Sequence, residues 1–356
     1  MGRATIKDVA REAGVSLSTV NKALTGKSGI SKELKQRVLE VAERLDYRVN
    51  PLAGSLARSA IRIGIVLPND WDEYYSDICE GIVYEMERFV NWKVEGVTLK
   101  YSVRGLDAEQ QALECVKSIH AQGIRAVIFC HGNYQFYSQA LAYAQQEKMD
   151  VICVGVGAPK AHPCLSTIEV DAAKCGRLAA EILEQCLPAG SAVAAIIGSN
   201  AIWPHAEKVR GFSQRLAEGG QLGFYGHLES DDDEQTAYRL TVQLLQQQAV
   251  QGIYVATGAV EGVCRAVAAC GLSGKIKVIA TDLTNACKAY MADGTVSFTI
   301  YQNTFLQGVT AVSMLYRYFT AGIIPAQQTA VPPMVFTKES LLEKEKRCIY
   351  TDVIDF

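Results

Sequence analysis

The chain has 356 residues, of which 49% are hydrophobic and 21% charged, and its formal net charge is −3 at pH 7. At roughly 100–200 residues per domain, this length predicts two or three folded units, and the composition excludes disordered, collagenous and disulfide-scaffold chains. No run approaches the ~18 apolar residues that span a bilayer, and residues 1–8 lack the apolar core of a secretory signal. The sequence therefore predicts a cytoplasmic protein with no membrane partner.

Charge is divided unevenly along the chain. Residues 1–60 hold 11 Lys and Arg against 6 Asp and Glu, whereas the remaining residues hold 24 against 32. A basic N-terminal segment beside an acidic remainder indicates a polyanionic partner at that end, although an excess of this size also arises by chance. The eleven cysteines form no Cys-x-x-Cys pair and no zinc spacing, so we expect reduced structural thiols, no metal and no cofactor.

The first forty-five residues show the pattern of three short helices. Thr5 opens the first, which has one apolar face, and Gly14 ends it. Ser16 is a fresh N-cap for a second helix running to Leu24, and Ser31 caps a third. Helices joined by a tight glycine turn predict a helix-turn-helix unit, and the alternative is a three-helix cap without a ligand.

The second helix has an outward face suited to DNA. At ~100° per residue, Val20 and Leu24 share the inward face, so Ser18 and Lys22 point outward. Lys22 can donate to guanine or to a phosphate, and Leu17 at the helix tip can touch a thymine methyl. Short hydroxyl side chains near helix N-termini suit phosphate oxygens, and here they are Thr5, Ser16 and Thr19.

The run TIKDVAREAGVSLSTV, from Thr5 to Val20, closely resembles the headpiece of the lactose-repressor (LacI/GalR) family of bacterial transcription regulators. The match continues without gaps to Asn50. The resemblance implies that positions 17, 18 and 22 read bases of double-stranded operator DNA. In the family, Ser-Arg usually follows the valine, whereas this chain has Asn21 and Lys22, and lysine lacks the bidentate fork of arginine.

A short hinge follows the headpiece. Asn50 with the next proline is a helix start, and Ala53 and Leu56 belong to a short apolar stripe that is not a stable helix alone. The resemblance implies that the hinge becomes helical on the operator, where Leu56 of each subunit wedges into the minor groove. The family usually has Pro at position 49 and Arg at position 54, where Val49 and Gly54 stand here. Glycine costs ~1 kcal/mol of helix propensity.

From residue 62 onward, β-rich runs alternate with helical stretches, which predicts α/β architecture with parallel sheets wound on both faces. Nearly three hundred residues are too many for one such sheet, so we expect two. The expected strands are Ile63–Leu67, Val97–Val103, Ala126–Cys130, Val151–Val156, Thr167–Val170, Val193–Gly198, Gly252–Thr257, Val278–Thr281 and Val296–Tyr301. The expected helices include Ala108–Gln122, Ala172–Leu187 and Glu261–Cys270.

This part is similar to the periplasmic-binding-protein-like effector domain of the same family, in which two lobes are hinged around a small molecule. The organisation expected is a headpiece at 1–49, a hinge at 50–60, an effector-binding and dimerisation domain at 61–340 and a tail at 341–356. Lobe 1 would take about 61–168 and 302–331, and lobe 2 about 169–301 and 332–340. The tail lacks the heptads of a coiled coil, so no tetramerising appendage is predicted.

Candidate effector residues follow the strands, because doubly wound sheets bind ligands beyond the carboxyl ends of their strands. The resemblance aligns Lys208 with an arginine that grips a sugar hydroxyl, with Arg210 as its alternative, and Asp282 with a strand-end aspartate. A carboxylate and an amine facing aromatic rings suit a neutral polyol. The candidates are Asp70, Trp71, Tyr74, Tyr75, His131, Asp171, Trp203, Lys208, Asp282 and Gln302.

Plainer interpretations compete with these assignments. Asp282 could cap a helix beginning near Asn285, and the aromatic residues could belong to the core or the ordinary surface. The acidic run Asp231–Glu234 is expected at a helix N-terminus, where the macrodipole favours it.

The leading hypothesis is a homodimeric, sequence-specific DNA-binding repressor of transcription that reads a palindromic operator. A small effector, a sugar or polyol by resemblance, would control operator affinity. A nucleobase and a phosphorylated protein co-regulator are the other effectors considered. A solute-binding protein of a transport system with no DNA role is the second hypothesis. An enzyme is the third, and we expect none, since no nucleophile elbow, P-loop or GxGxxG lies at a strand–helix junction.

Overall fold

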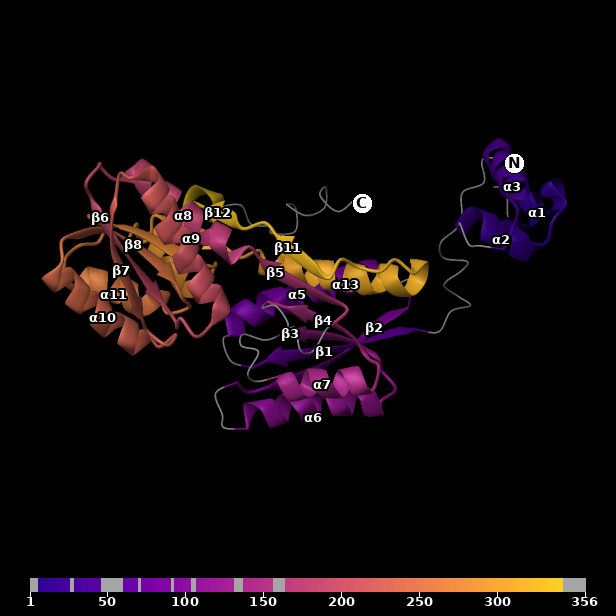
Figure 1. The fold of residues 1–356 in the computed structure, drawn as a ribbon, viewed down its shortest axis with the longest axis horizontal. Coiled ribbons are helices and arrows are strands. Elements are labelled where there is room, and N and C mark those ends of the chain that lie inside the picture. Colours follow the sequence, from indigo (N-terminus) through magenta and orange to yellow (C-terminus); the bar gives the residue numbers. More distant parts are fainter. Residues whose placement is uncertain are drawn as a thin grey trace. The chain divides into compact units, whose positions relative to one another are not determined.

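The computed structural model describes residues 6–25, 29–45, 60–69, 72–90, 93–103, 107–130, 137–155 and 164–341. Two compact units are present: one comprises residues 1–60 with 91–93, and the other comprises 61–90 with 94–356. Figure 1 shows the helices and strands of both units, which are treated separately below.

The first unit is a three-helix headpiece of α1 (Ile6–Ala13), α2 (Leu17–Thr25) and α3 (Lys32–Arg44). Its core consists of small apolar side chains around Val9, Val20 and Val38, which are completely buried. The turn between α1 and α2 needs a left-handed residue, and Gly14 supplies it with a φ of 64°.

Two serines cap the helices of the headpiece as the sequence predicted. Ser16 Oγ accepts a hydrogen bond from the backbone N–H of Thr19 at 3.2 Å, and Ser31 Oγ accepts one from the N–H of Leu34 at 3.2 Å. The predicted helix-turn-helix arrangement is therefore confirmed.

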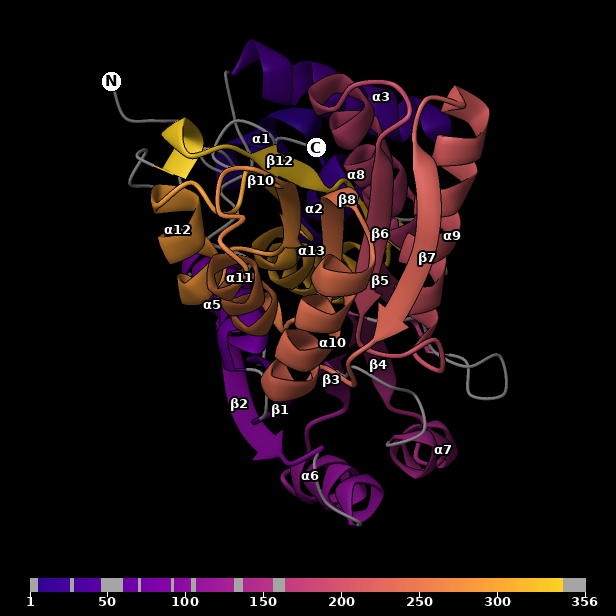
Figure 2. The ribbon, with the colours of Figure 1, turned by 90° about the vertical axis from the view of Figure 1, so that its left-hand side faces the viewer.

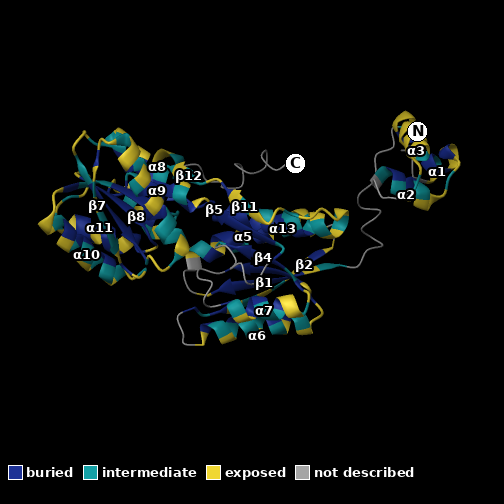
Figure 3. Cartoon of the chain, in the orientation of Figure 1, coloured by how far each residue is buried: buried dark blue, intermediate teal, exposed yellow. Residues whose placement is uncertain are grey.

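The first sheet of the second unit is entirely parallel, with strand order β11-β5-β4-β3-β1-β2. Its strands are β1 (Ile61–Pro68), β2 (Val94–Tyr101), β3 (Ala126–Cys130), β4 (Asp150–Val154), β5 (Ser166–Val170) and β11 (Gln328–Val331). Helices α6 (Ala108–Ala121) and α7 (Ser138–Gln146) cover one face, and α5 (Asp72–Arg88) and α13 (Thr304–Ala321) cover the other (Figure 1). The central strands are buried between these layers (Figure 3).

The second sheet has the order β12-β10-β9-β8-β6-β7 and is parallel except for β12. Its strands are β6 (Ala192–Ile197), β7 (Gly223–Glu229), β8 (Val250–Ala256), β9 (Lys277–Thr281), β10 (Phe298–Tyr301) and β12 (Met334–Phe336). Figure 2 shows α8 (Ala172–Cys186) and α9 (Trp203–Gly219) on one side of it. Helices α10 (Glu234–Gln247), α11 (Val260–Ala269) and α12 (Asn285–Ala292) lie on the other.

The two sheets define two lobes, called lobe 1 for the sheet containing β1 and lobe 2 for the sheet containing β6. Within the described residues the chain passes between them three times: after β5, after β10 and between β11 and β12. Pro332 and Pro333 form the third passage. The predicted doubly wound α/β fold with two sheets is thus confirmed.

Both lobes contain helices that are in backbone contact through glycines. A Cβ atom on Gly81 of α5 would lie 2.0 Å from the carbonyl oxygen of Phe305 in α13, and one on Gly308 would lie 2.1 Å from that of Ile78. In lobe 2, a Cβ atom on Gly176 of α8 would lie 1.9 Å from the carbonyl oxygen of Lys208 in α9. Only glycine permits such an approach, so Gly81 and Gly308 set the contact of α5 with α13, and Gly176 sets that of α8 with α9.

The strands that the sequence missed are β7, β11 and β12, and β2 begins and ends two to three residues earlier than predicted. All four lie at the edges of the sheets. Edge strands are solvated on one side, so they lack the continuous apolar runs that revealed the central strands. Among the described helices, none is long and apolar enough to cross a membrane.

Candidate functional site

The outer face of α2 presents the side chains expected to read DNA. Leu17 is 44% exposed at the helix tip, and Ser18 is exposed beside it. Lys22 is partly exposed and forms no ion pair with a described residue, so its ammonium is available to an anion.

The N-terminus of α2 is organised by a pair of hydroxyls. Ser16 Oγ and Thr19 Oγ1 are 2.9 Å apart, and Thr19 is partly buried. This pairing sets both oxygens at the positive end of the helix, where phosphate oxygens bind. The side chain of Asn21 and the predicted contact residues Thr5, Asn50, Ala53 and Leu56 lie outside the described residues, so their roles stay predictions.

A pocket of about 230 Å³ opens between α5 of lobe 1 and the start of α12 in lobe 2. The crossover from β10 to α13 contributes to its wall through Tyr301 and Thr304. Its ionisable and aromatic lining includes Glu73, Tyr74, Asp77, Glu80, Asp282 and Lys288.

Asp282 is held in place by the lobe crossover. It follows β9 in a left-handed conformation, with a φ of 65°. One carboxylate oxygen accepts a hydrogen bond from the backbone N–H of Gln302 at 3.1 Å, and the other accepts one from Nε2 of Gln302 at 2.7 Å. Burial raises the pKa of Asp282, and the nearby ammonium of Lys208 opposes that rise.

The capping interpretation of Asp282 is wrong. The N-cap of α12 is Thr284, whose side chain accepts a hydrogen bond from the N–H of Cys287 at 3.1 Å. Asp282 therefore does not cap α12, and it belongs to the lining of the pocket.

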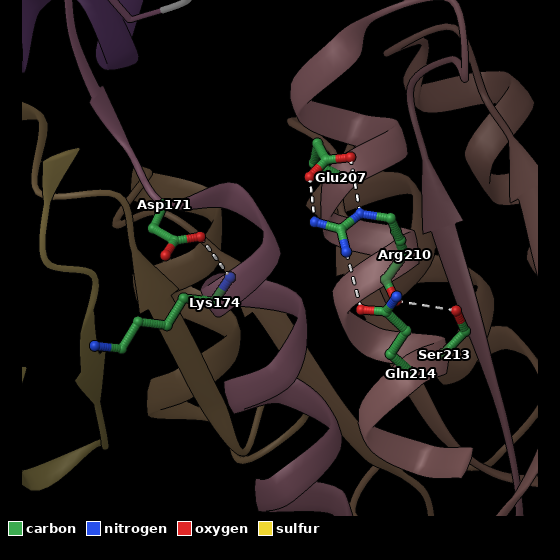
Figure 4. A network of polar contacts seen from close by, with 6 residues as sticks. All are labelled: Asp171, Lys174, Glu207, Arg210, Ser213 and Gln214. Atoms are coloured by element: carbon green, nitrogen blue, oxygen red, sulfur yellow. Dashed lines mark hydrogen bonds and ion pairs between the residues drawn. The ribbon is translucent and has the colours of Figure 1, made fainter. Parts of the chain in front are cut away.

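Lys208 and Arg210 lie on opposite sides of α9. Lys208 is only 3% exposed and lies near Asp282 and His205, inside lobe 2. Arg210 is exposed, donates two hydrogen bonds to Glu207 at 2.9 and 2.6 Å and a third to Gln214 at 2.9 Å (Figure 4). Neither residue lines the pocket, and Arg210 does not replace Lys208 beside Asp282.

The other predicted effector residues divide into those near the pocket and those away from it. Tyr74 lines the pocket. Tyr75 is buried in the core, and its ring packs edge-on against the ring of Tyr74 with 5.0 Å between the two ring centroids. Asp171 caps α8 by accepting a hydrogen bond from the N–H of Lys174 at 2.9 Å (Figure 4). Trp203, at the start of α9, is 49% exposed and does not line the pocket. Asp70, Trp71 and His131 lie outside the described residues.

Sequence reasoning missed two carboxylates of α5. Asp77 is buried and accepts hydrogen bonds from the hydroxyls of Tyr301 and Thr304. Glu73 accepts one from the backbone N–H of Asn285 at 2.6 Å, which joins lobe 1 to the start of α12. Two carboxylates one helical turn apart, directly after the end of a strand, were the sequence signal that could have predicted these site residues.

A second missed cluster lies at the carboxyl ends of β6 and β8. Asp232 accepts hydrogen bonds from the hydroxyl of Thr257 and from the N–H of Gly258. His205 Nδ1 accepts one from the N–H of Ser199 at 3.2 Å. Burial lowers the pKa of His205 to about 4, although Asp232 opposes that shift.

This cluster corrects the expectation for the acidic run Asp231–Glu234. Asp233 is the N-cap of α10 and Glu234 stands in its first turn, as predicted. Asp232 instead has a φ of 54° and turns toward the sheet edge. No group of described residues has the composition of a metal site.

Comparison with known proteins covers both units. The family model for bacterial regulatory proteins of the lacI family matches residues 5–50, and the model for a periplasmic binding protein domain matches residues 63–322. Catabolite control protein A from Priestia megaterium is 26% identical over 220 residues, which cover 61% of this chain and 62% of that protein. The protein of the same name from Staphylococcus aureus is 26% identical over 232 residues, covering 62% of this chain and 63% of that one. The alignments thus span less than two thirds of these relatives.

Solved structures resemble the two-lobed unit. A glucose-galactose binding protein from Geobacillus stearothermophilus superposes with a TM-score of 0.69 at 19% identity, covering 80% of this chain and all of that one. A periplasmic ribose ABC transporter protein from Conexibacter woesei gives 0.71 at 21% identity, covering 80% and 94%. These likenesses establish the fold.

The fold and its two sites define a two-lobed periplasmic binding protein domain preceded by a helix-turn-helix headpiece. Because the headpiece and the larger domain each match their models in the expected order, the chain belongs to the lacI family of bacterial regulatory proteins.

Proposed function

We propose that this protein is a sequence-specific transcriptional repressor that binds double-stranded operator DNA through α2. The observation that carries the proposal is the headpiece itself, which leaves Leu17, Ser18 and Lys22 at the surface of its second helix. A helix of this kind enters the major groove and reads base edges with its N-terminal half. The relatives named catabolite control protein A support a regulatory role, and we infer that the protein exercises it in the cytoplasm without enzymatic activity.

We infer that the protein acts as a homodimer, because one recognition helix covers too few base pairs for a unique site. Exposed apolar side chains support this inference. They cluster at the C-terminal ends of the packed helices α5 and α13, and they are Val90, Phe319, Ile323 and Ile324. Large apolar side chains exposed at one end of a helix pair are a feature of protein interfaces.

We further infer that a small polyhydroxylated effector binds between the lobes and controls operator affinity. The pocket supports this inference because it combines carboxylates with the ring of Tyr74, the combination that sugar-binding sites use. Ligand closure would act through Asp282, whose contact with Gln302 connects the pocket to the crossover between the lobes. An effector that changes affinity by ~5–150-fold needs only a modest preference for one lobe arrangement.

Selection of random duplex DNA by the purified full-length protein at physiological salt tests the proposal. We expect a palindrome whose half-sites are about 10 base pairs apart, centre to centre, with a deformable central step. A Phe319→Glu variant should lose the dimer in sedimentation velocity and with it most operator affinity. If no sequence is enriched with or without added sugars, the proposal is wrong. Retention of both properties by Phe319→Glu would remove this patch from the dimer interface.

A further inference from the structure

The pocket between α5 and α12 has an unusual balance of charge. Its lining includes four carboxylates, Glu73, Asp77, Glu80 and Asp282, against the single ammonium of Lys288. Three of the four come from α5, where spacings of four and three residues place them on one face of the helix. The described lining therefore carries a formal excess of negative charge.

Uncharged donors hold these carboxylates. Glu73 accepts hydrogen bonds from the backbone N–H and the side-chain amide of Asn285, at 2.6 and 3.3 Å. Asp282 accepts from the amide groups of Gln302. Within the described residues, Glu73 and Glu80 form no ion pair, and the cation that lies near Asp282 is the ammonium of Lys208.

Two buried polar atoms behind the lining provide a separate observation. Oε1 of Gln307 and the hydroxyl of Tyr254 are completely buried and have no hydrogen-bond partner among the described residues. Gln307 lies against the hydroxyl of Tyr74, and Tyr254 lies near Asp282, so both border residues that line the pocket. Buried polar atoms without partners are rare in folded proteins, and an ordered water commonly satisfies them. The amide oxygen of Gln307 can only accept, and the donor that lies beside it is the hydroxyl of Tyr74, a residue of the pocket lining.

We propose that the effector is a polyhydroxylated compound bearing a protonated amine, such as an amino sugar, rather than a neutral or phosphorylated sugar. This inference rests on the proposed function and specifies the ligand class for the same pocket. An ammonium group supplies three donors and no acceptor, which matches a lining dominated by acceptors. Its charge balances carboxylates of which Asp77 is buried and Asp282 is partly buried, whereas a phosphate would add negative charge beside them.

The size of the pocket limits the ligand. Its volume of about 230 Å³ is smaller than that of pockets for drug-sized molecules, which run to roughly 300–1,000 Å³. A monosaccharide is the appropriate scale. The ring of Tyr74 would then cover an apolar face of the sugar while the amine faces α5.

Matched pairs of ligands test the proposal on the full-length protein. Glucosamine, galactosamine and mannosamine are each compared by calorimetry with glucose, galactose and mannose, and with the 6-phosphates of these sugars. We expect at least one amino sugar to bind with a Kd about tenfold or more below that of its hydroxyl counterpart. Its affinity should fall with added salt, because screening weakens the attraction to the carboxylates. The same amino sugar should change affinity for the selected operator.

A pair of glutamates on α5 gives matched variants. Glu80→Gln removes one pocket charge at nearly constant volume and should reduce the preference for the amine several-fold. Glu87→Gln removes an exposed charge from the same helix outside the pocket lining, and should leave the preference unchanged. Equal losses in the two variants would overturn the role of the pocket.

The outcomes separate this inference from the proposed function. If a neutral or phosphorylated sugar binds as tightly as every amine, or if no amine binds, the inference is wrong while sugar control of the operator stands. If the operator is bound but none of the sugars changes its affinity, both the amino-sugar inference and the proposal that a sugar is the effector are wrong. Failure to select any operator is a failure of the proposed function alone, and amine binding is then still scored by calorimetry.

Discussion

Asp282 and Gln302 form a two-point contact, in which the backbone N–H and the side-chain amide of one residue donate to the two carboxylate oxygens of the other. Asp282 follows β9 in lobe 2, and Gln302 stands in the passage from β10 to α13 in lobe 1. A ligand that competes for this carboxylate therefore acts directly on a segment joining the lobes. Such a contact is a physical link between effector binding and lobe arrangement, as an allosteric mechanism requires.

Substitution of Asp282 tests this link. Asp282→Ala should abolish the effector response at concentrations that saturate the wild type, because a charged hydrogen-bond acceptor is worth about 1.5–3 kcal/mol, or roughly 10–100-fold in affinity. Operator binding should persist, since the headpiece is untouched. The measurement is operator affinity by fluorescence anisotropy across an effector titration. Asp293→Ala, at the C-terminus of α12, is the control and should respond normally. A fully responsive Asp282→Ala would place the site elsewhere.

Lys22 is expected to read one position of each half-site. Lys22→Ala should weaken operator binding by about 1–3 kcal/mol and relax the base preference at that position. Repeating the duplex selection with the variant shows whether one column of the motif loses its preference. Lys35→Ala on α3 removes an exposed lysine away from the face of α2, and should weaken all sequences alike or none. An unchanged motif for Lys22→Ala would leave this lysine as a phosphate contact.

His205 should make the protein less stable in mild acid. Its pKa is about 4 in the folded protein against 6.5 in the unfolded chain, so only the unfolded state binds a proton between these values. Stability from the neutral imidazole is complete above pH 6.5 and is lost as the pH falls toward 4, by about 3 kcal/mol in full. Urea unfolding at several pH values measures the slope.

A pair of histidine variants isolates this effect. His205→Gln should flatten the dependence of unfolding free energy on pH between 6.5 and 4, because the group that gains a proton on unfolding is gone. His227→Gln, on the edge strand β7, is the matched control and should keep the wild-type slope. Identical slopes in the two variants would show that His205 does not titrate as described.

Gly176 holds α8 against α9 and thereby positions Lys208. Gly176→Ala would place a methyl group 1.9 Å from the carbonyl oxygen of Lys208, so the helices must separate. We expect a loss of about 1–3 kcal/mol or more in unfolding free energy, together with weaker effector binding. Gly258→Ala is the control, because nothing lies within 4 Å of its added Cβ atom. Equal stability of the two variants would show that α9 adapts easily.

The sequence by itself determined the elements that depend on local patterns. Ser16, Gly14 and Ser31 predicted the caps and the turn of the headpiece, because capping and left-handed turns involve residues only a few positions apart. The central strands were also predictable, since burial on both faces of a parallel sheet demands continuous apolar runs. The opposite orientations of Lys208 and Arg210 followed from helical periodicity, which turns residues two apart to different sides.

Only the tertiary structure decided which strand-end residues meet. Asp171 and Asp282 look alike in sequence, since each is an aspartate directly after a strand, yet one caps α8 and the other lines the pocket. Glu73 and Asp77 gained their roles from residues more than two hundred positions away: Asn285 at the start of α12, and Tyr301 and Thr304 at a lobe crossover. Such partners are fixed by how the chain passes between two sheets, and no local propensity or periodicity encodes that path. The physical reason is that caps and strands are short-range choices of the backbone, whereas a pocket forms from side chains that only the packed lobes bring together.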